Sequence, residues 1–419
     1  MLKSVIAKEY DEKDIKDCDL DKLQSYIKCQ KLDSALKITR HGIKTKSWVG
    51  IIKYKNLHLE ILPKLISAND DRSTILKNLI FMLSYTKKLD IKTNDNAKLA
   101  NEKNPFIEIL IREFANSLFE SLKRLTPKRY VREEENLNYL KGKIKFSENI
   151  RYNCTNQAKF YCEYDEFSEN NLLNQLFLFV STCLYNISNN SNNKKTLKFI
   201  INYYSDISFV RFDKFKVKKI KLTRNQELFK KSFNLAKMFV EQTSVDLSKN
   251  KFENITLVWD MNNLFEEFVY ELIKRNIPEC SPIAQKTKRL LRQAQETRRD
   301  TKVDILVQNP QVIIDTKYKK FTCFDDIKNA DIFQVSTYCL LHKYHRAVLL
   351  YPQFEENEPD ITSFHLNTEE GPLNIDFCTI NLKHNDLKDK SVQQSIVEKI
   401  KNILKITSSQ YTNSNSQSG

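Results

Sequence analysis

Glycine is scarce in this chain, with only five among 419 residues. A phosphate-binding loop of the form G-x-x-x-x-G-K-[ST] needs glycines at fixed spacing, because side chains would keep the backbone away from the phosphates. No pair has that spacing, since the glycines stand at positions 42, 50, 142, 371 and 419. We therefore expect that the chain binds no nucleotide itself and is not its own nucleotide-driven motor.

The nine cysteines lack the spacing that a disulfide framework or a metal site requires. They are dispersed and odd in number, and no two form a C-x-x-C pair. This pattern argues against a structural zinc and an iron–sulfur cluster. The sequence also has neither a signal-peptide-like start nor an apolar run of bilayer length. We expect a cytoplasmic protein with reduced thiols and no membrane partner.

Positive charge is abundant: the formal net charge is +15, and lysines and arginines are spread over most segments. Such a distribution favours long-range attraction to a polyanion over a single docking arm. Nucleic acid is therefore the expected partner. The alternative is compositional, since richness in lysine, asparagine and isoleucine is typical of an AT-biased coding sequence.

Length and periodicity predict several domains. A chain of 419 residues with 41% apolar residues can build two or three packed cores. Apolar spacing predicts short strands near the N-terminus, two helices within 73–125, and a surface loop over the polar run 188–195. We predict an α/β (α+β multidomain) protein with a β-rich N-terminal domain containing two helices over 1–140, a mainly helical region over 141–250, a mixed sheet flanked by helices over 251–407, and a disordered tail over 408–419.

One hairpin is predicted to carry the chemistry. Two apolar runs within 303–317 flank Asn309-Pro310, which is typical of two strands joined by a turn. Asp304 lies near the start of the first strand. Asp315 and Lys317 end the second and, being two residues apart, project from the same face. Two carboxylates beside an ammonium are what metal-dependent phosphodiester cleavage requires.

Two predicted helices flank this hairpin. The first, over 261–275, places Glu266 on the edge of its apolar stripe, whereas Glu267 lies further round toward solvent. The second, over 325–344, places Gln334 and Tyr338 one turn apart on a common face. Glu266 is the better candidate to face the hairpin, but which of the two glutamates does so stays open at this point.

The elements follow in a fixed order: a helix with Glu, a strand with Asp, a strand with Asp-x-Lys, and a helix with Gln and Tyr. This order resembles that of the PD-(D/E)xK nuclease superfamily. Val303 departs from the pattern, because the superfamily has proline there. More narrowly, the chain resembles the McrC family, the nuclease subunit of McrBC-type modification-dependent restriction systems. The stretches that carry this resemblance begin at Trp48, Leu59, Leu140, Asn171, Asp260, Asp315 and Asp331.

The resemblance implies a role for each site residue. Asp304 and Asp315 would ligate Mg²⁺, or Mn²⁺ in its place, with the Thr316 carbonyl as a further ligand. Lys317 would orient the attacking water and stabilise charge on the phosphate, and Glu266 would complete the site by holding Lys317 or a metal-bound water. Gln334 and Tyr338 would support the strand or the hairpin, with simple helix packing as the alternative. Residues 251–407 would form the nuclease domain.

The resemblance also implies partners. McrC-like nucleases work with a separate McrB-type AAA+ GTPase ring, whose hydrolysis they stimulate. We expect residues 1 to about 250 to be mainly a partner-docking module. Double-stranded DNA is the expected substrate. A second copy of the chain is expected in the cleaving assembly, because one such site cuts one strand.

Three other functions remain open from the sequence. A regulatory or adaptor protein on a nuclease-like fold is disfavoured, because the chain keeps Asp304, Asp315 and Lys317 together. A recombination or repair exonuclease on the same fold is disfavoured by the missing cysteine cluster. An RNA or transposon-end nuclease is not distinguished by these residues.

Overall fold

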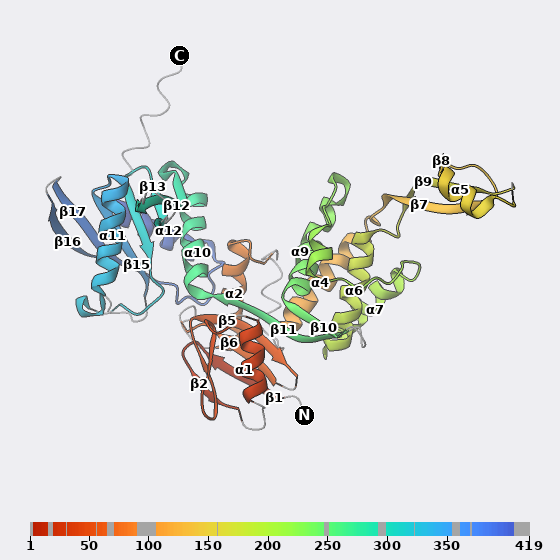
Figure 1. Cartoon of the computed structure of the whole chain (residues 1–419). Coiled ribbons are helices and arrows are strands. Elements are labelled where there is room, and N and C mark those ends of the chain that lie inside the picture. The colour runs from red at the N-terminus through yellow and green to blue at the C-terminus, as the bar shows by residue number, and fades with distance from the viewer. Residues whose placement is uncertain are drawn as a thin grey trace, which may run out of the picture. The chain divides into compact units, whose positions relative to one another are not determined.

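The computed structural model describes residues 3–15, 20–30, 32–55, 57–64, 71–89, 106–156, 158–246, 251–291, 299–321, 323–353, 361–368 and 371–405. The predicted disordered tail over 408–419 lies outside these residues. The chain forms two compact units, of which unit 1 contains residues 1–51, 57–103 and 258–419 and unit 2 contains residues 52–56 and 104–257 (Figure 1). No described helix is both long enough and apolar enough to cross a membrane.

The N-terminal part of unit 1 is rich in strands, as predicted. Strand β1 (Lys3–Lys8) pairs in parallel with β6 (Leu57–Leu62), all six residues of which are buried. Helices α1 (Leu20–Cys29) and α2 (Arg72–Tyr85) belong to the same part. A second sheet has the order β2-β4-β3, with bounds Glu12–Asp14, Gly42–Thr45 and Leu36–Ile38.

The C-terminal part of unit 1 is a six-stranded mixed sheet with the order β12-β13-β14-β15-β17-β16. Strand β13 is antiparallel to both of its neighbours, β12 and β14, whereas β14, β15 and β17 run parallel and β16 is an antiparallel edge. Their bounds are Pro282–Leu291 for β12, Arg299–Val307 for β13, Val312–Thr316 for β14, Arg346–Pro352 for β15, Ile361–Thr368 for β16 and Gly371–Ile380 for β17.

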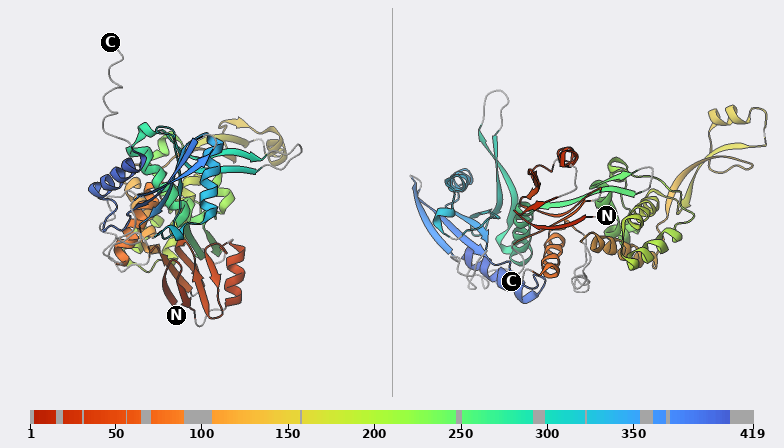
Figure 2. Two further views of the ribbon diagram at one scale, coloured as in Figure 1. Left: turned by 90° about the vertical axis from the view of Figure 1, so that its left-hand side faces the viewer. Right: turned by 90° about the horizontal axis from the view of Figure 1, so that it is seen from below.

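Helices cover both faces of this sheet. Helix α11 (Asn329–His342) packs on one face, while α10 (Met261–Asn276) and α12 (Lys390–Leu404) lie together on the other (Figure 2). Short 3₁₀ turns occupy Pro278–Cys280 and Phe324–Asp326. The core under α11 includes Val303 and Tyr338, so Val303 serves as a packing residue. The predicted mixed α/β architecture is confirmed.

Unit 2 combines a helical bundle with a small sheet. Helices α4, α6, α7 and α9 pack together, with bounds Phe106–Leu122, Leu172–Ile187, Ser191–Tyr203 and Lys230–Glu241. Helix α8 (Lys214–Lys218) and a 3₁₀ helix (Arg224–Phe229) precede α9. Strand β10 (Thr243–Asp246) pairs with β11 (Lys251–Asp260). The unit boundary falls within β5 (Trp48–Tyr54) and within β11.

The small sheet of unit 2 has the order β7-β9-β8, and helix α5 packs on β9. The bounds are Arg129–Leu137 for β7, Lys143–Ile144 for β8, Phe146–Asn153 for α5 and Phe160–Ser168 for β9. We call this group, residues 129–168, the β7–β9 subdomain. Strands β8 and β9 of this subdomain lie within residues 141–250, whose described part is mainly helical, as predicted.

One sequence prediction is corrected, and the compact units divide the chain at other points than the predicted domains. The surface loop over 188–195 is shorter than predicted, because Asn190 accepts hydrogen bonds from the N–H groups of Asn192 and Asn193 and so begins α7 at Ser191. Asparagine is a favoured N-cap for this reason. The compact units do not follow the predicted boundaries at 140 and 250, since the N-terminal strands belong to the same unit as the C-terminal sheet.

Candidate active site

The β13–β14 hairpin brings the two predicted aspartates to one end of the sheet. Its ladder runs from Val307 beside Val312 to Ile305 beside Ile314. Just past this last pair, the Thr316 N–H and hydroxyl both donate to Asp304 Oδ2, at 2.8 and 3.0 Å. The side chain of Asp304 is therefore fixed against the end of β14 by two hydrogen bonds.

Asp315 is the most enclosed acidic residue of the hairpin, with 0% of its surface exposed. Burial, together with the nearby negative charge of Asp304, raises the pKa of the Asp315 carboxyl, while Lys317 opposes this rise. Among the described residues, Asp315 Oδ1 has no hydrogen-bond partner. A buried carboxylate oxygen without a donor is costly unless a cation or a proton satisfies it.

Lys317 is the cation beside this carboxylate. Its Nζ lies 2.6 Å from Asp315 Oδ2 and donates to Gln334 Oε1 at 3.2 Å. Burial alone would lower the pKa of Lys317, but the Asp315 charge leaves that pKa raised. The side chain is therefore held as a charged ammonium at the edge of the site.

Helix α11 supplies the second layer of contacts. Gln334 Nε2 donates to the Tyr338 hydroxyl at 2.6 Å, one helical turn further on. Since Gln334 also accepts from Lys317, the two side chains form a short chain that ends on the ammonium. Gln334 thus joins the Tyr338 hydroxyl to the Lys317 ammonium, while Tyr338 itself also packs in the core under α11.

Asp331 and Lys319 belong to the same cluster, and no role was predicted for either. Lys319 Nζ lies 2.5 Å from Asp331 Oδ2, and Lys317 Nζ lies 3.9 Å from Asp331 Oδ1. Their spacing in the sequence is the feature that could have placed them in the site. Lys319 is two residues after Lys317, and Asp331 is three residues before Gln334. One aspartate of α11 therefore faces both lysines.

The choice between the two glutamates of α10 is decided by their partners. Glu266 accepts a hydrogen bond from Gln285 at 3.0 Å, and burial together with the Asp304 charge raises its pKa. Glu267 instead pairs with Lys88 at 2.9 Å. Glu266 is the residue near Asp304, and its hydrogen bond comes from Gln285 rather than from Lys317. Of the two roles predicted for it, holding Lys317 or holding a metal-bound water, the second stays a prediction.

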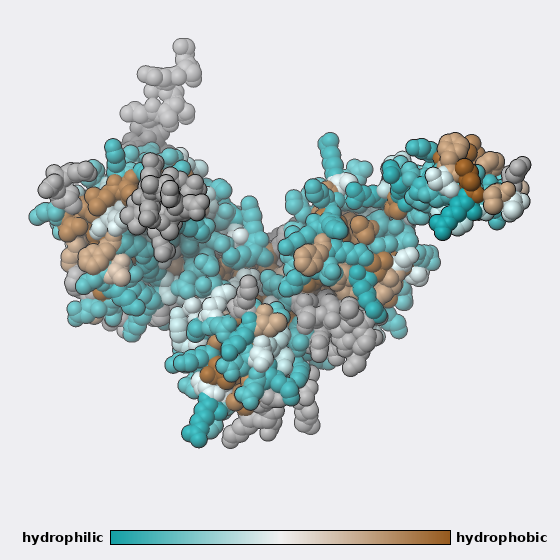
Figure 3. Space-filling model, viewed as in Figure 1, coloured by the Kyte–Doolittle hydropathy of each residue, from teal (hydrophilic) through white to brown (hydrophobic). Residues whose placement is uncertain are grey.

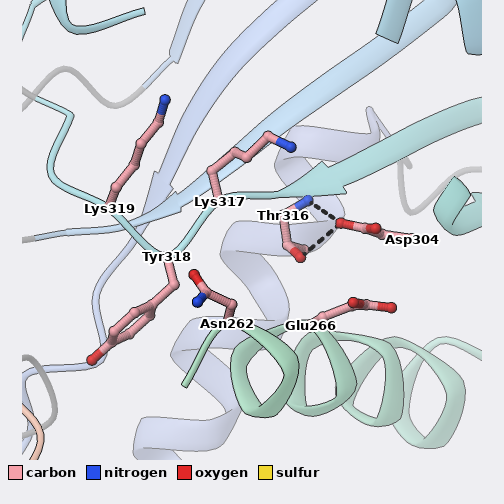
Figure 4. A pocket seen from close by; sticks show the side chains of 7 residues that line it. All are labelled: Asn262, Glu266, Asp304, Thr316, Lys317, Tyr318 and Lys319. Atoms are coloured by element: carbon pink, nitrogen blue, oxygen red, sulfur yellow. Dashed lines mark hydrogen bonds between the residues drawn. The ribbon is translucent and has the colours of Figure 1, made fainter. Parts of the chain in front are cut away.

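These residues line a pocket of about 260 Å³ (Figure 4). Figure 4 shows Glu266 and Asp304 facing each other across it, with the Lys317 ammonium directed toward Asp304. The lining residues are Asn262, Glu266, Asp304, Thr316, Lys317, Tyr318 and Lys319. Asn262 is held by Asp260 at 2.8 Å and by the Ser47 hydroxyl at 2.9 Å.

The donor set fits a hard cation that keeps part of its water shell. Within the described residues, no three His, Cys, Asp or Glu side chains are grouped closely enough to hold a metal on their own. Mg²⁺ is commonly bound by one or two carboxylates and several waters. Two carboxylates are available here, those of Asp304 and Asp315. The Oδ1 atom of Asp315 is buried and has no donor in the described part of the chain, so a cation could satisfy it.

Comparisons with known proteins support one family. The family described as McrBC 5-methylcytosine restriction system component matches residues 43–352. A comparison with curated proteins gives no match.

Two solved structures resemble the chain in fold. One is a refined half-complex from a tetradecameric assembly of Thermococcus gammatolerans McrB AAA+ hexamers with bound McrC: it gives a TM-score of 0.75 at 22% identity, covering 96% of this chain and 100% of the other. The other is the Thermococcus gammatolerans McrBC complex determined by cryo-EM, with a TM-score of 0.54 at 24% identity, covering 66% of this chain and 88% of the other. At these identities the likeness is one of fold.

Proposed function

Because this chain belongs to the family of McrBC 5-methylcytosine restriction system components, we propose that it is the nuclease subunit of such a system and cleaves DNA phosphodiester bonds with Mg²⁺. The observation that carries the proposal is the ion pair of 2.6 Å between Lys317 and the buried Asp315, next to a fixed Asp304. An adaptor without activity would not need to keep a buried carboxylate paired in this way, since burying charge costs free energy.

Each residue has a role in this mechanism. Asp304 and Asp315 would hold the metal, which when bound would polarise the phosphate and acidify a water. Lys317, kept charged by Asp315, has one N–H left beside its contacts with Asp315 and Gln334. It donates this N–H to the attacking water, while its positive charge stabilises the phosphate oxygen on which negative charge develops. Gln334 and Tyr338 hold the ammonium in place, and Glu266 lies across the pocket, where it can accept a hydrogen bond from a water.

The substrate class follows from charge and from the family. A net charge of +15 favours a polyanion, and we propose double-stranded DNA. A single site of this kind breaks one strand, so double-strand cleavage requires a second copy of the chain in the assembly. The same site chemistry would also serve a repair nuclease or a nuclease acting on RNA, and the choice of substrate in the experiment below separates these.

We propose an AAA+ GTPase ring as the partner. The similar Thermococcus gammatolerans structure contains McrB AAA+ hexamers with bound McrC. Residues 1 to about 250 were predicted to dock the partner, and within them the β7–β9 subdomain exposes large apolar side chains (Figure 3). These are Tyr130, Tyr139, Leu140, Phe146, Ile150, Tyr152 and Phe167. Such a patch favours a protein interface.

The test uses the full chain with its AAA+ partner, nucleotide, Mg²⁺ and methylated duplex DNA. Asp315→Ala and Lys317→Ala should each lower the cleavage rate by at least about 1000-fold and leave stimulation of GTP hydrolysis intact. Asp325→Ala and Lys390→Ala, at exposed positions of unit 1, are matched controls and should cleave normally. Undiminished cleavage by Asp315→Ala would refute the proposal, and RNA or single-stranded DNA as the better substrate would favour the alternatives.

A further inference from the structure

The N-terminal sheet reaches the catalytic loop through one side chain. Glu9, the residue after β1, accepts a hydrogen bond on Oε2 from the Tyr318 hydroxyl at 2.9 Å. The two residues are 309 positions apart in the chain but lie in the same compact unit. Tyr318 directly follows Lys317 and lines the same pocket. A residue far outside the predicted nuclease region therefore touches the loop that carries the catalytic lysine.

Glu9 is rigidly held by the ends of two strands. Its N–H donates to the Leu62 carbonyl at 3.0 Å, and its Oε2 also accepts from the Lys64 N–H at 3.1 Å. Only 1% of its surface is exposed. Burial raises the pKa of Glu9 to about 8, so near neutral pH the carboxyl is largely uncharged and can stay buried beside a phenol. The parallel strands β1 and β6 thus present a fixed acceptor to Tyr318.

Tyr318 joins this fixed acceptor to the loop that follows β14. Its ring is 4% exposed and packs against Phe265 of α10, with ring centroids 5.9 Å apart. On one side of Tyr318 the Lys317 N–H donates to the Leu350 carbonyl of β15 at 2.9 Å, and on the other the Lys319 N–H donates to the Lys317 carbonyl at 2.9 Å. Tyr318 and its neighbours therefore pin the loop between the sheet and the N-terminal strands.

A second contact ties the N-terminal part to the opposite wall of the pocket. The Met261 N–H at the start of α10 donates to the Ser47 carbonyl at 2.8 Å, and the Asn262 side chain donates to the Ser47 hydroxyl at 2.9 Å. Asn262 lines the pocket. The N-terminal strands and their loops therefore hold both the β14 loop and the beginning of α10.

We propose that Glu9 is a positioning residue of the nuclease centre: by holding the Tyr318 hydroxyl it keeps Lys317 in register with Asp315, so that the N-terminal sheet is part of the active centre. This rests on the nuclease function proposed above. Catalytic groups must be held within a fraction of an ångström of the productive geometry, so loss of a supporting hydrogen bond lowers the rate more than it weakens binding.

The experiment compares three variants of the full chain with its partner. Tyr318→Phe removes only the donor, Glu9→Ala removes the acceptor, and Glu9→Gln keeps an acceptor oxygen. We expect Tyr318→Phe and Glu9→Ala to lower the single-turnover cleavage rate by about 10–100-fold with the Kd for DNA changed less than about twofold, and Glu9→Gln to stay near wild type. Tyr85→Phe is the matched control, because its hydroxyl accepts from Asn276 outside the pocket.

Amide hydrogen exchange supplies a readout that does not depend on cleavage. Exchange at 317–319 should accelerate at least about tenfold in Tyr318→Phe and Glu9→Ala and remain slow in Glu9→Gln. Wild-type exchange and wild-type cleavage in Tyr318→Phe would overturn the proposal. A fast-cutting Asp315→Ala would instead overturn the nuclease assignment alone. If Glu9→Ala does not fold, Tyr318→Phe, which keeps the ring, still decides the question.

Discussion

Lys319, which lines the pocket, forms an ion pair with Asp331, and 2.5 Å separate Nζ from Oδ2. The same carboxylate lies 3.9 Å from the Lys317 ammonium. Asp331 therefore neutralises one lysine that lines the pocket and helps to orient another. In the proposed function, a DNA phosphate that enters the pocket would have to compete with this carboxylate for Lys319.

The first prediction is that Asp331→Asn has opposite effects on binding and on rate. Lys319 becomes available to a DNA phosphate, so the Kd for duplex DNA should fall about 3–10-fold at low salt, with a salt dependence steeper by about one counterion. Lys317 loses a neighbouring charge that helps to orient it, so single-turnover cleavage should slow by about tenfold. Fluorescence anisotropy and quenched-flow cleavage measure the two effects. Asp325→Asn, at an exposed position, is the control.

The second prediction concerns the pH dependence of stability and tests the burial of Glu9. Its pKa is about 8 in the folded chain against an ordinary value of 4.5, so the folded state binds the proton more tightly than the unfolded one. The resulting stability is fully present below the unfolded pKa and is lost as pH rises through the folded pKa. Glu9→Gln cannot ionise and escapes this loss.

Wild type should therefore lose about 2–3 kcal/mol of unfolding free energy from pH 6 to pH 8 that Glu9→Gln does not lose. Denaturant unfolding of both chains at the two pH values measures the difference. Lys64 and Asp260 also act on this carboxyl and are unchanged in the variant, so they affect both chains alike. A difference between the two chains that stays constant over this range would contradict a proton held by Glu9.

Much of the β13–β14 hairpin of the candidate site could be predicted from the sequence, because it depends on local patterns. The apolar runs on either side of Asn309-Pro310 form β13 and β14, and the two-residue spacing of Asp315 and Lys317 puts them in contact. The apolar stripe of α10 also directs Glu266 rather than Glu267 toward Asp304. In each case the periodicity of one element fixes the direction of its side chains.

The contacts that join distant segments could not be predicted in this way. Glu9 and Tyr318 each look ordinary in their own strand or loop, and only the packing of β1 and β6 beside the β14 loop brings them together. The same holds for Ser47 and Asn262. The same packing places the N-terminal strands in one compact unit with a sheet that begins more than 200 residues later.

The third prediction concerns the partner surface. Phe146 and Ile150 lie one turn apart on α5 and are 72% and 68% exposed. Replacing both with aspartate should leave the fold intact, because neither side chain is in a core. It should lower stimulation of the partner's GTP hydrolysis by at least about tenfold, since charges in an apolar interface lose most of the binding free energy. Steady-state GTPase assays measure this.

Leu366→Asp, on the exposed face of β16 in unit 1, is the control for that double variant. It introduces one aspartate, against two in the double variant, at a residue that is 44% exposed, and should stimulate GTP hydrolysis normally. Full stimulation by the Phe146→Asp, Ile150→Asp chain would place the docking surface elsewhere within residues 1 to about 250. Equal losses in both variants would indicate a non-specific effect of added negative charge.

The last prediction separates the structural and metal-binding roles of Asp304. Its Oδ2 accepts from both the N–H and the hydroxyl of Thr316, so part of its effect is to fix the end of β14. Asp304→Asn keeps an acceptor oxygen for Thr316 but removes the charge that a hard cation requires. It should leave the unfolding free energy nearly unchanged while weakening Mn²⁺ binding, measured by calorimetry, by at least about tenfold.

Asp304→Ala loses the acceptor as well as the charge, so it should also cost about 1–3 kcal/mol of unfolding free energy for the unpaired Thr316 donors. Two variants that share a loss of metal binding but differ in stability are expected only if Asp304 both ties the hairpin and holds the ion. Were Asp304→Asn to bind Mn²⁺ as wild type does, the metal would have to rest on Asp315, whose Oδ1 has no donor within the described residues. The Asp304 carboxylate would then serve only to end the β13–β14 ladder.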